Sequence, residues 1–311
     1  PMPRERFEME DGLIGVTTIP TRPESSRLYR LPGGRLAAET PSEAARLAAG
    51  AGWFLGPWAR RVCRVGRAGE RRALHRLEHR WAAGVSNFLD IEWDVGGLEH
   101  IVAGRRHIVL PLHEGFADGL GVLRLGLDAR FVARDELFEW PTLGRYLQAS
   151  DQVLVDPQAP RTAYRRLLAA GRETLDRDEA LVVFPQGSIL GIEVAFWPGA
   201  FRLAERLDAW ILPVVITGSH RVWEYPYSPL VRFGRQVSVR VLPGVPSQEA
   251  RMSARAVESE MKRVALNDMA APVRRFRPGI DGYWDDYSYG IDPAFSDLAV
   301  QVAAHRESSS R

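Results

Sequence analysis

The sequence predicts an α/β protein: a mixed, largely parallel sheet of about seven strands flanked by helices, preceded by an amphipathic helical hairpin. From residue 91 onward, short apolar segments alternate with helix-length amphipathic ones. This order is typical of parallel strands whose sheet is covered by helices on both faces. Before residue 91, apolar residues recur instead at helical spacing over two long stretches.

Seven segments have the length and apolar content of buried strands: residues 91–95, 108–112, 131–133, 153–155, 181–184, 211–216 and 237–242. Helical patterns occupy residues 118–127, 136–149, 160–175, 199–208 and 247–268. No internal repeat or Gly/Ser-rich linker divides this region. We therefore expect residues 91–271 to form one α/β domain.

Residues 41–90 predict the helical hairpin. Its first helix begins at Pro41-Ser42-Glu43 and is expected to kink at Pro57, and its second helix follows Gly69. Tryptophan-rich apolar faces bordered by arginine suit the interface of a membrane, and packing of both helices on the domain core is equally consistent with the spacing. The residues concerned are Trp53, Phe54, Trp58, Trp81 and Phe88.

The two ends of the chain carry different compositions. Residues 1–40, rich in Pro, Arg, Glu, Ser and Gly, predict an irregular arm. Residues 272–311 predict an aromatic and acidic arm followed by a frayed tail. The first ten residues are charged and show no apolar signal-peptide core, and the longest uncharged run, residues 47–59, is too short to span a bilayer.

Composition excludes several classes of protein. Of 311 residues, 45% are hydrophobic, which allows a sizeable core. The net charge of only +2 does not indicate nucleic-acid binding. Cys63 is the single cysteine, so neither a disulfide framework nor a thiolate metal site is expected, and a reducing compartment fits. We expect a cytoplasmic protein that associates peripherally with the inner face of the cell membrane.

One pair of residues has the spacing of a catalytic base and its orienting acid. The predicted strand 108–112 ends at His113, and Asp118 lies five residues on, in the first turn of the next helix. A carboxylate there can bind one imidazole nitrogen, fix the tautomer and leave the other nitrogen as a base. Of the seven histidines, only His113 has an acid at this spacing, although a structural histidine at a strand end is the alternative interpretation.

Other chemistries lack their motifs. A serine hydrolase would need Gly-x-Ser-x-Gly, and Gln186 stands where the first glycine before Ser188 should be. No phosphate-binding glycine loop is present, and no spacing around His113 indicates a metal site.

Four further blocks follow His-x4-Asp in a fixed order, namely residues 131–157, 181–188, 196–204 and 211–223. This order resembles the glycerolipid acyltransferase superfamily, whose best-known members are the 1-acylglycerol-3-phosphate acyltransferases, over about residues 88–245. The resemblance implies an α/β fold, a thioester donor (acyl-CoA or acyl-carrier protein) as co-substrate without a further cofactor, and a lipid hydroxyl as acceptor.

The resemblance assigns roles to residues of this chain. His113 is expected to be the general base and Asp118 the residue that orients it. The strand-to-turn segment 185–188 could offer backbone N–H groups to the oxyanion. The expected substrate-binding residues are Arg134, Gln186, Gly187, Ser188 and, as a substitute cation, Arg161.

The chain departs from the family pattern where the acceptor phosphate is usually bound. Pro157 and Ile189 replace arginines, and Gln186 replaces a glutamate. The family also usually has asparagine and serine where this chain has Leu112 and Gly115. These changes predict an altered acceptor. They leave open a non-catalytic lipid- or acyl-binding protein, or a thioesterase, on the same fold.

Overall fold

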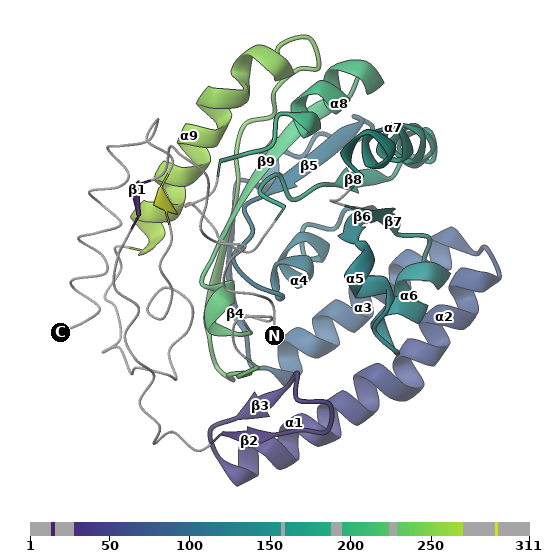
Figure 1. The fold of residues 1–311 in the computed structure, drawn as a ribbon, viewed down its shortest axis with the longest axis vertical. Helices are drawn as coiled ribbons and strands as arrows, with labels where there is room; N and C mark the ends of the chain where they lie inside the picture. The colour runs from purple at the N-terminus through teal and green to yellow at the C-terminus, as the bar shows by residue number, and fades with distance from the viewer. Residues whose placement is uncertain are drawn as a thin grey trace.

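The computed structural model describes residues 14–15, 28–156, 159–187, 195–223, 229–269 and 290–291, and its centre is a seven-stranded sheet (Figure 1). The strand order is β4-β10-β9-β5-β8-β6-β7. Strands β9, β5, β8, β6 and β7 run parallel, whereas β10 is antiparallel to β9 and pairs in parallel with β4. The mixed, largely parallel α/β sheet expected from the sequence is therefore confirmed.

The strands lie within two residues of their predicted bounds. They are β4 (Glu92–Gly96), β5 (His107–Pro111), β6 (Ala129–Arg134), β7 (Val153–Val155), β8 (Ala180–Val182), β9 (Trp210–Thr217) and β10 (Gln236–Val241). The helices of the domain are α4 (Asp118–Leu123), α5 (Asp135–Phe138), α6 (Leu143–Ala149), α7 (Pro160–Asp176), α8 (Gly199–Leu207) and α9 (Ala250–Met269).

Two helices differ from their predictions by four residues or more, and one of them, expected over residues 118–127, ends at Leu123. The stretch 136–149 was expected to be continuous, but it forms α5 and α6 with a break around Pro141. Proline lacks the N–H that a continuous helix needs and disfavours helical backbone in the residue before it. The prediction of a single helix here was wrong for that reason.

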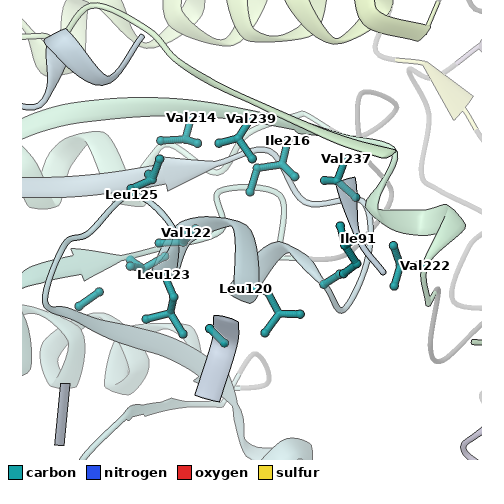
Figure 2. Close-up of a cluster of buried hydrophobic side chains, with 14 of the residues drawn as sticks. Ile91, Leu120, Val122, Leu123, Leu125, Val214, Ile216, Val222, Val237 and Val239 are labelled. Atoms are coloured by element: carbon teal, nitrogen blue, oxygen red, sulfur yellow. The ribbon is translucent and has the colours of Figure 1, made fainter. Parts of the chain in front are cut away.

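The sheet is buried on both faces, as its nearly continuous apolar strands require. Alternate residues of β9 point to opposite sides, so Ile211 and Val215 join a core with α7, α8 and α9. The neighbouring residues Leu212, Val214 and Ile216 join a second core with α4. Leu120, Val122 and Leu123 of α4 belong to the same buried cluster as the valines of β9 and β10 (Figure 2), which fixes the helix that follows β5.

The predicted hairpin consists of α1 (Pro41–Trp53), a π-helical turn (Phe54–Trp58), α2 (Ala59–Arg67) and α3 (Arg71–Phe88). Thr40 caps α1 through a capping box with Glu43. Pro57 lies in the π-helical turn, where the sequence predicted a kink. Gly69, at a φ of 72°, makes the turn before α3. Helix α2 contacts α6 and α3 contacts α4, so the hairpin packs against the domain (Figure 1).

A buried polar cluster joins the hairpin to the domain. His75 of α3 lies between two carboxylates, with Nδ1 2.9 Å from Glu78 and Nε2 3.0 Å from Glu179, which precedes β8. Arg71 donates two hydrogen bonds to Glu179, and the hydroxyl of Tyr146 on α6 donates to Glu78 at 2.7 Å. The cluster therefore ties α3 to α6 and to the start of β8.

The cluster shifts the pKa values of its members in opposite directions. Burial disfavours the charged imidazole of His75, but the hydrogen bonds and charges of Glu179 and Glu78 outweigh it and raise the pKa to about 9. Burial opposes ionisation of Glu179 too, but its bonds to His75 and Arg71 lower the pKa to about 2. The charged forms of both groups are therefore the stable ones at neutral pH.

The arms of the chain are described only in part. Within residues 1–40, β2 (Tyr29–Arg30) pairs with β3 (Ala37–Ala38), so this part of the predicted irregular arm has regular structure. β1 (Ile14–Gly15) pairs with β11 (Gly290–Ile291), one strand from each arm. The other residues of the predicted N-terminal and C-terminal arms lie outside the described residues, apart from the segment that precedes α1. Among the helices that the structure describes, none has both the length and the apolar content to cross a membrane.

Candidate active site

The candidate site lies at the carboxyl edge of the parallel strands. Because β5, β8 and β9 run in the same direction, the residues that follow them gather at one edge of the sheet, where α/β proteins bind ligands. His113 comes two residues after β5, Phe184 two residues after β8, and Gly218 directly after β9. The neighbouring order β9-β5-β8 brings these three ends together.

The predicted pair, His113 and Asp118, is in hydrogen-bond contact. The Nδ1–H of His113 donates to Oδ2 of Asp118 at 2.6 Å, and the same oxygen accepts the backbone N–H groups of Glu114 at 2.7 Å and Gly115 at 3.0 Å. The Asp118 side chain is fully buried, whereas 21% of the His113 side chain is exposed. Within the described part of the chain, Nε2 of His113 makes no hydrogen bond. The arrangement holds one imidazole nitrogen and leaves the other open to a substrate.

Gly115 explains one departure from the family pattern. A Cβ at this position would lie 2.8 Å from the backbone carbon and oxygen of Ser219, closer than atoms can approach. The serine that the resemblance implies here has no room beside this backbone. The missing side chain lets the loop after β5 lie directly on the turn after β9.

The turn after β8 forms the neighbouring wall. The Phe184 ring stacks on the His113 imidazole with centroids 4.1 Å apart. Gly187 has a φ of 68°, and its N–H donates to the carbonyl of Phe184 at 3.2 Å. Within the segment 185–188, the amide of Gly187 is therefore occupied by a hydrogen bond inside the turn. Trp197, 68% exposed, lies beside Gly187 and donates its backbone N–H to Pro185.

The remaining predicted substrate-binding residues are spread along the same edge. Gln186 is buried, with 2% of its surface exposed. Arg134 ends β6 and pairs with Glu136 at 3.1 Å. Arg161 is exposed on the first turn of α7, after β7, which lies three strands from β5, or about 14 Å at the usual strand spacing. Ser188, and the departures at Pro157 and Ile189, lie outside the described residues.

The sequence reasoning missed three groups at this edge. Phe184 and His220 lie in predicted motif blocks without a role of their own, and Glu114 was given no role. Glu114 is completely buried beside His113 and accepts hydrogen bonds from the N–H of Gly218 and from His220. A carboxylate that follows a buried strand directly was the available signal, because an acid in such a place needs partners. Over the described residues, no group of three or more His, Cys, Asp or Glu side chains could hold a metal ion.

Known proteins are similar to this chain over the region that contains the site. Residues 92–217 match the family model described as Acyltransferase. A 1-acyl-sn-glycerol-3-phosphate acyltransferase of Limnanthes alba is 26% identical over 133 residues, which are 42% of this chain and 47% of the relative. A chloroplastic one of Arabidopsis thaliana is 23% identical over 158 residues, 49% of this chain and 43% of the relative. The chain spans about half the length of the curated relatives it matches.

A solved structure has the same fold. The crystal structure of the 1-acyl-sn-glycerophosphate acyltransferase PlsC from Thermotoga maritima matches with a TM-score of 0.60 at 20% identity. The match covers 74% of this chain and 96% of that one. The family model spans β4 to the end of β9 and therefore includes His113, Asp118 and Phe184. The resemblance predicted from the sequence is confirmed: residues 92–217 match the Acyltransferase family model, and the curated relatives are 1-acyl-sn-glycerol-3-phosphate acyltransferases.

Proposed function

We propose that this protein is an acyltransferase that moves a fatty acyl group from a thioester donor, acyl-CoA or acyl-carrier protein, to a hydroxyl of a lysophospholipid or related lipid. The observation that carries the proposal is the hydrogen bond between His113 and the buried Asp118, which orients an Nε2 that makes no hydrogen bond to the described residues. The match of residues 92–217 to the Acyltransferase family model and the names of the curated relatives support it.

The proposed chemistry uses His113 as a general base. Its Nε2 takes the proton of the acceptor hydroxyl as the oxygen attacks the thioester carbonyl. Asp118 stabilises the imidazolium that forms. When the tetrahedral intermediate collapses, the C–S bond breaks and the leaving thiolate takes the proton back from His113. The products are the acylated lipid and a free thiol, and no covalent enzyme intermediate is needed because the thioester is already activated.

We propose that the hairpin attaches the enzyme to the membrane surface from which the acceptor is taken, at the inner face of the cell membrane. Trp53 and Leu55, around the π-helical turn, are 55% and 43% exposed. Exposed arginines continue from this tip along α2 and α3: Arg60, Arg61, Arg64, Arg67, Arg72, Arg76 and Arg80. Near an anionic bilayer each such cation contributes about 1 kcal/mol of attraction.

The packing of the other aromatic residues of the hairpin restricts the proposed membrane-contacting residues to its tip. Trp81 stacks on Tyr146 and donates its indole N–H to the carbonyl of Phe54. Phe88 packs between Phe54 and Phe233. These aromatic side chains pack within the hairpin and between the hairpin and the domain. Trp53 is exposed at the tip, and we propose that it inserts into the lipid.

The proposed acceptor is less anionic than lysophosphatidic acid. A phosphate dianion is best held by guanidinium donors. Pro157 and Ile189 supply none, Gln186 is uncharged, and the guanidinium of Arg134 is already paired with Glu136. A lyso-aminolipid or a glycolipid places less charge in such a site.

The test incubates the intact chain with acyl-CoA and each lysolipid in turn, and measures the free thiol released and the acylated lipid formed. We expect both products from the wild type, and a fall of about 10²- to 10⁴-fold for His113→Ala. Equal concentrations of lysophosphatidic acid and a zwitterionic lysolipid then compete for acylation. Clear preference for lysophosphatidic acid would contradict the acceptor assignment.

The same assay separates the two alternatives. A thioesterase would release thiol and free fatty acid without acylating any lipid. A non-catalytic lipid-binding protein would release no thiol with either acyl-CoA or acyl-carrier protein as donor. Either result would overturn the proposed transferase.

A further inference from the structure

We propose that Glu114 and His220 form a buried positioning pair that holds the His113–Asp118 dyad in its reactive geometry. The inference rests on the proposed function, since it concerns the same reaction. It assigns a role to two residues that do not themselves reach the reacting atoms. The pair links the loop after β5 to the turn after β9, 106 residues apart in the chain.

The Glu114 side chain accepts two hydrogen bonds from the turn after β9. Its Oε2 accepts the backbone N–H of Gly218 at 2.9 Å and the Nδ1–H of His220 at 3.1 Å. The Glu114 side chain is fully buried and that of His220 is 9% exposed. A buried carboxylate keeps its charge only when such donors surround it, so this side chain cannot leave its place without a large cost in free energy.

The backbone of the same residue contacts the catalytic acid. The N–H groups of Glu114 and Gly115 both donate to Oδ2 of Asp118, the oxygen that receives the proton of His113 Nδ1. The side chain of Glu114 therefore fixes the peptide that in turn fixes Asp118. A continuous series of hydrogen bonds runs from His220 through Glu114 to Asp118 and His113.

Neighbouring contacts hold the two loops at the same separation. Gly115 lies so close to the backbone of Ser219 that no side chain fits between them. The N–H of Phe116 donates to the carbonyl of Trp223 at 3.0 Å, and their rings lie 4.4 Å apart. Against this packing, loss of the His220 contact would shift the loop over a short distance rather than unfold it. Displacement of a catalytic group by about 1 Å costs roughly 10²-fold in rate.

The experiment compares His220→Leu with His220→Asn. Leucine removes the Nδ1–H donor, whereas the amide of asparagine places an N–H near the position of Nδ1 and restores the bond to Glu114. We expect His220→Leu to lower kcat by about 10²-fold with KM within twofold, and His220→Asn to recover most of the loss. His100→Leu is the matched control, because His100 also donates through Nδ1 to a partner far along the chain, the carbonyl of Val241.

A second readout follows the dyad directly. The ¹⁵N NMR signals of the His113 imidazole, identified by their absence in His113→Gln, report which ring nitrogen carries the proton. We expect the Nδ1–H tautomer in the wild type, in His220→Asn and in His100→Leu, and a mixture of tautomers in His220→Leu. If His220→Leu does not fold, His220→Gln, whose longer amide does not match the Nδ1 position, takes its place in both measurements.

Two results would overturn the proposal. One is an unchanged tautomer and kcat in the variant that lacks the donor. The other is an equal loss in the leucine and asparagine variants, which would mean that only the bulk of the ring matters. The NMR measurement needs no substrate. A wild type without acyltransferase activity would therefore refute the proposed function, while the tautomer result would still decide whether Glu114 and His220 position the dyad.

Discussion

Replacement of His75 by glutamine is expected to destabilise the protein in a pH-dependent manner. In the fold His75 is buried between Glu78 and Glu179, which raise its pKa from an ordinary 6.5 to about 9. That difference corresponds to about 3 kcal/mol of stabilisation. Glutamine keeps the polarity but carries no charge, so at pH 6 two buried carboxylates lose their shared cation.

The sign of the pH dependence follows from the direction of the pKa shift. Because the folded pKa lies above the unfolded one, the contribution of His75 is fully present below about pH 6.5 and is lost as the pH rises through about 9. Glu179, with its pKa lowered from 4.5 to about 2, stays ionised throughout this window and loses its contribution only in acid. The destabilisation by His75→Gln should therefore be about 3 kcal/mol larger at pH 6 than at pH 10.

The assay is urea unfolding followed by tryptophan fluorescence at both pH values. Leu74→Ala is the control, since it removes a buried side chain from the same helix, 1% exposed, without removing a titrating group. It should cost about 2–5 kcal/mol equally at pH 6 and pH 10. Equal destabilisation by His75→Gln at the two pH values would refute the assignment of a charged imidazole to this cluster.

Three further substitutions test the site and the membrane surface. Asp118→Asn should lower kcat by about 10²- to 10⁴-fold at unchanged melting temperature, and near-normal turnover would remove the dyad assignment. Trp53→Ser should reduce flotation with anionic liposomes. Leu98→Ser, at an apolar residue outside the hairpin that is 47% exposed against 55% for Trp53, should not. Equal flotation of the wild type and both variants would contradict the membrane surface. Gly115→Ala should lower kcat by about 10²-fold, because the added Cβ would lie 2.8 Å from the backbone of Ser219 and displace the loop. Gly119→Ala is the control, because its Cβ meets no atom within 4 Å and activity should stay intact. A fully active Gly115→Ala would show that the position of this loop does not matter for catalysis.

The sequence by itself determined the features that depend on neighbours along the chain. Strand and helix periodicities identified the seven strands, and five-residue spacing placed Asp118 beside His113. Both features depend on residues close in the sequence. A strand, a short turn and a helix in succession can place Asp118, five residues on, beside His113. The break at Pro141 is local as well, and the steric effect of proline predicts it once the helix is tested residue by residue.

The tertiary structure alone decided which distant residues meet. Glu114 and His220 are 106 residues apart in the sequence, and His75 and Glu179 are 104 apart, yet each pair is in hydrogen-bond contact. The sheet order and the docking of the hairpin bring their elements together. It also decided that Trp81 packs inward while Trp53 stays exposed, although both lie on the same kind of amphipathic pattern. Periodicity shows which face of a helix is apolar, but whether that face meets protein or solvent depends on what the rest of the chain places against it.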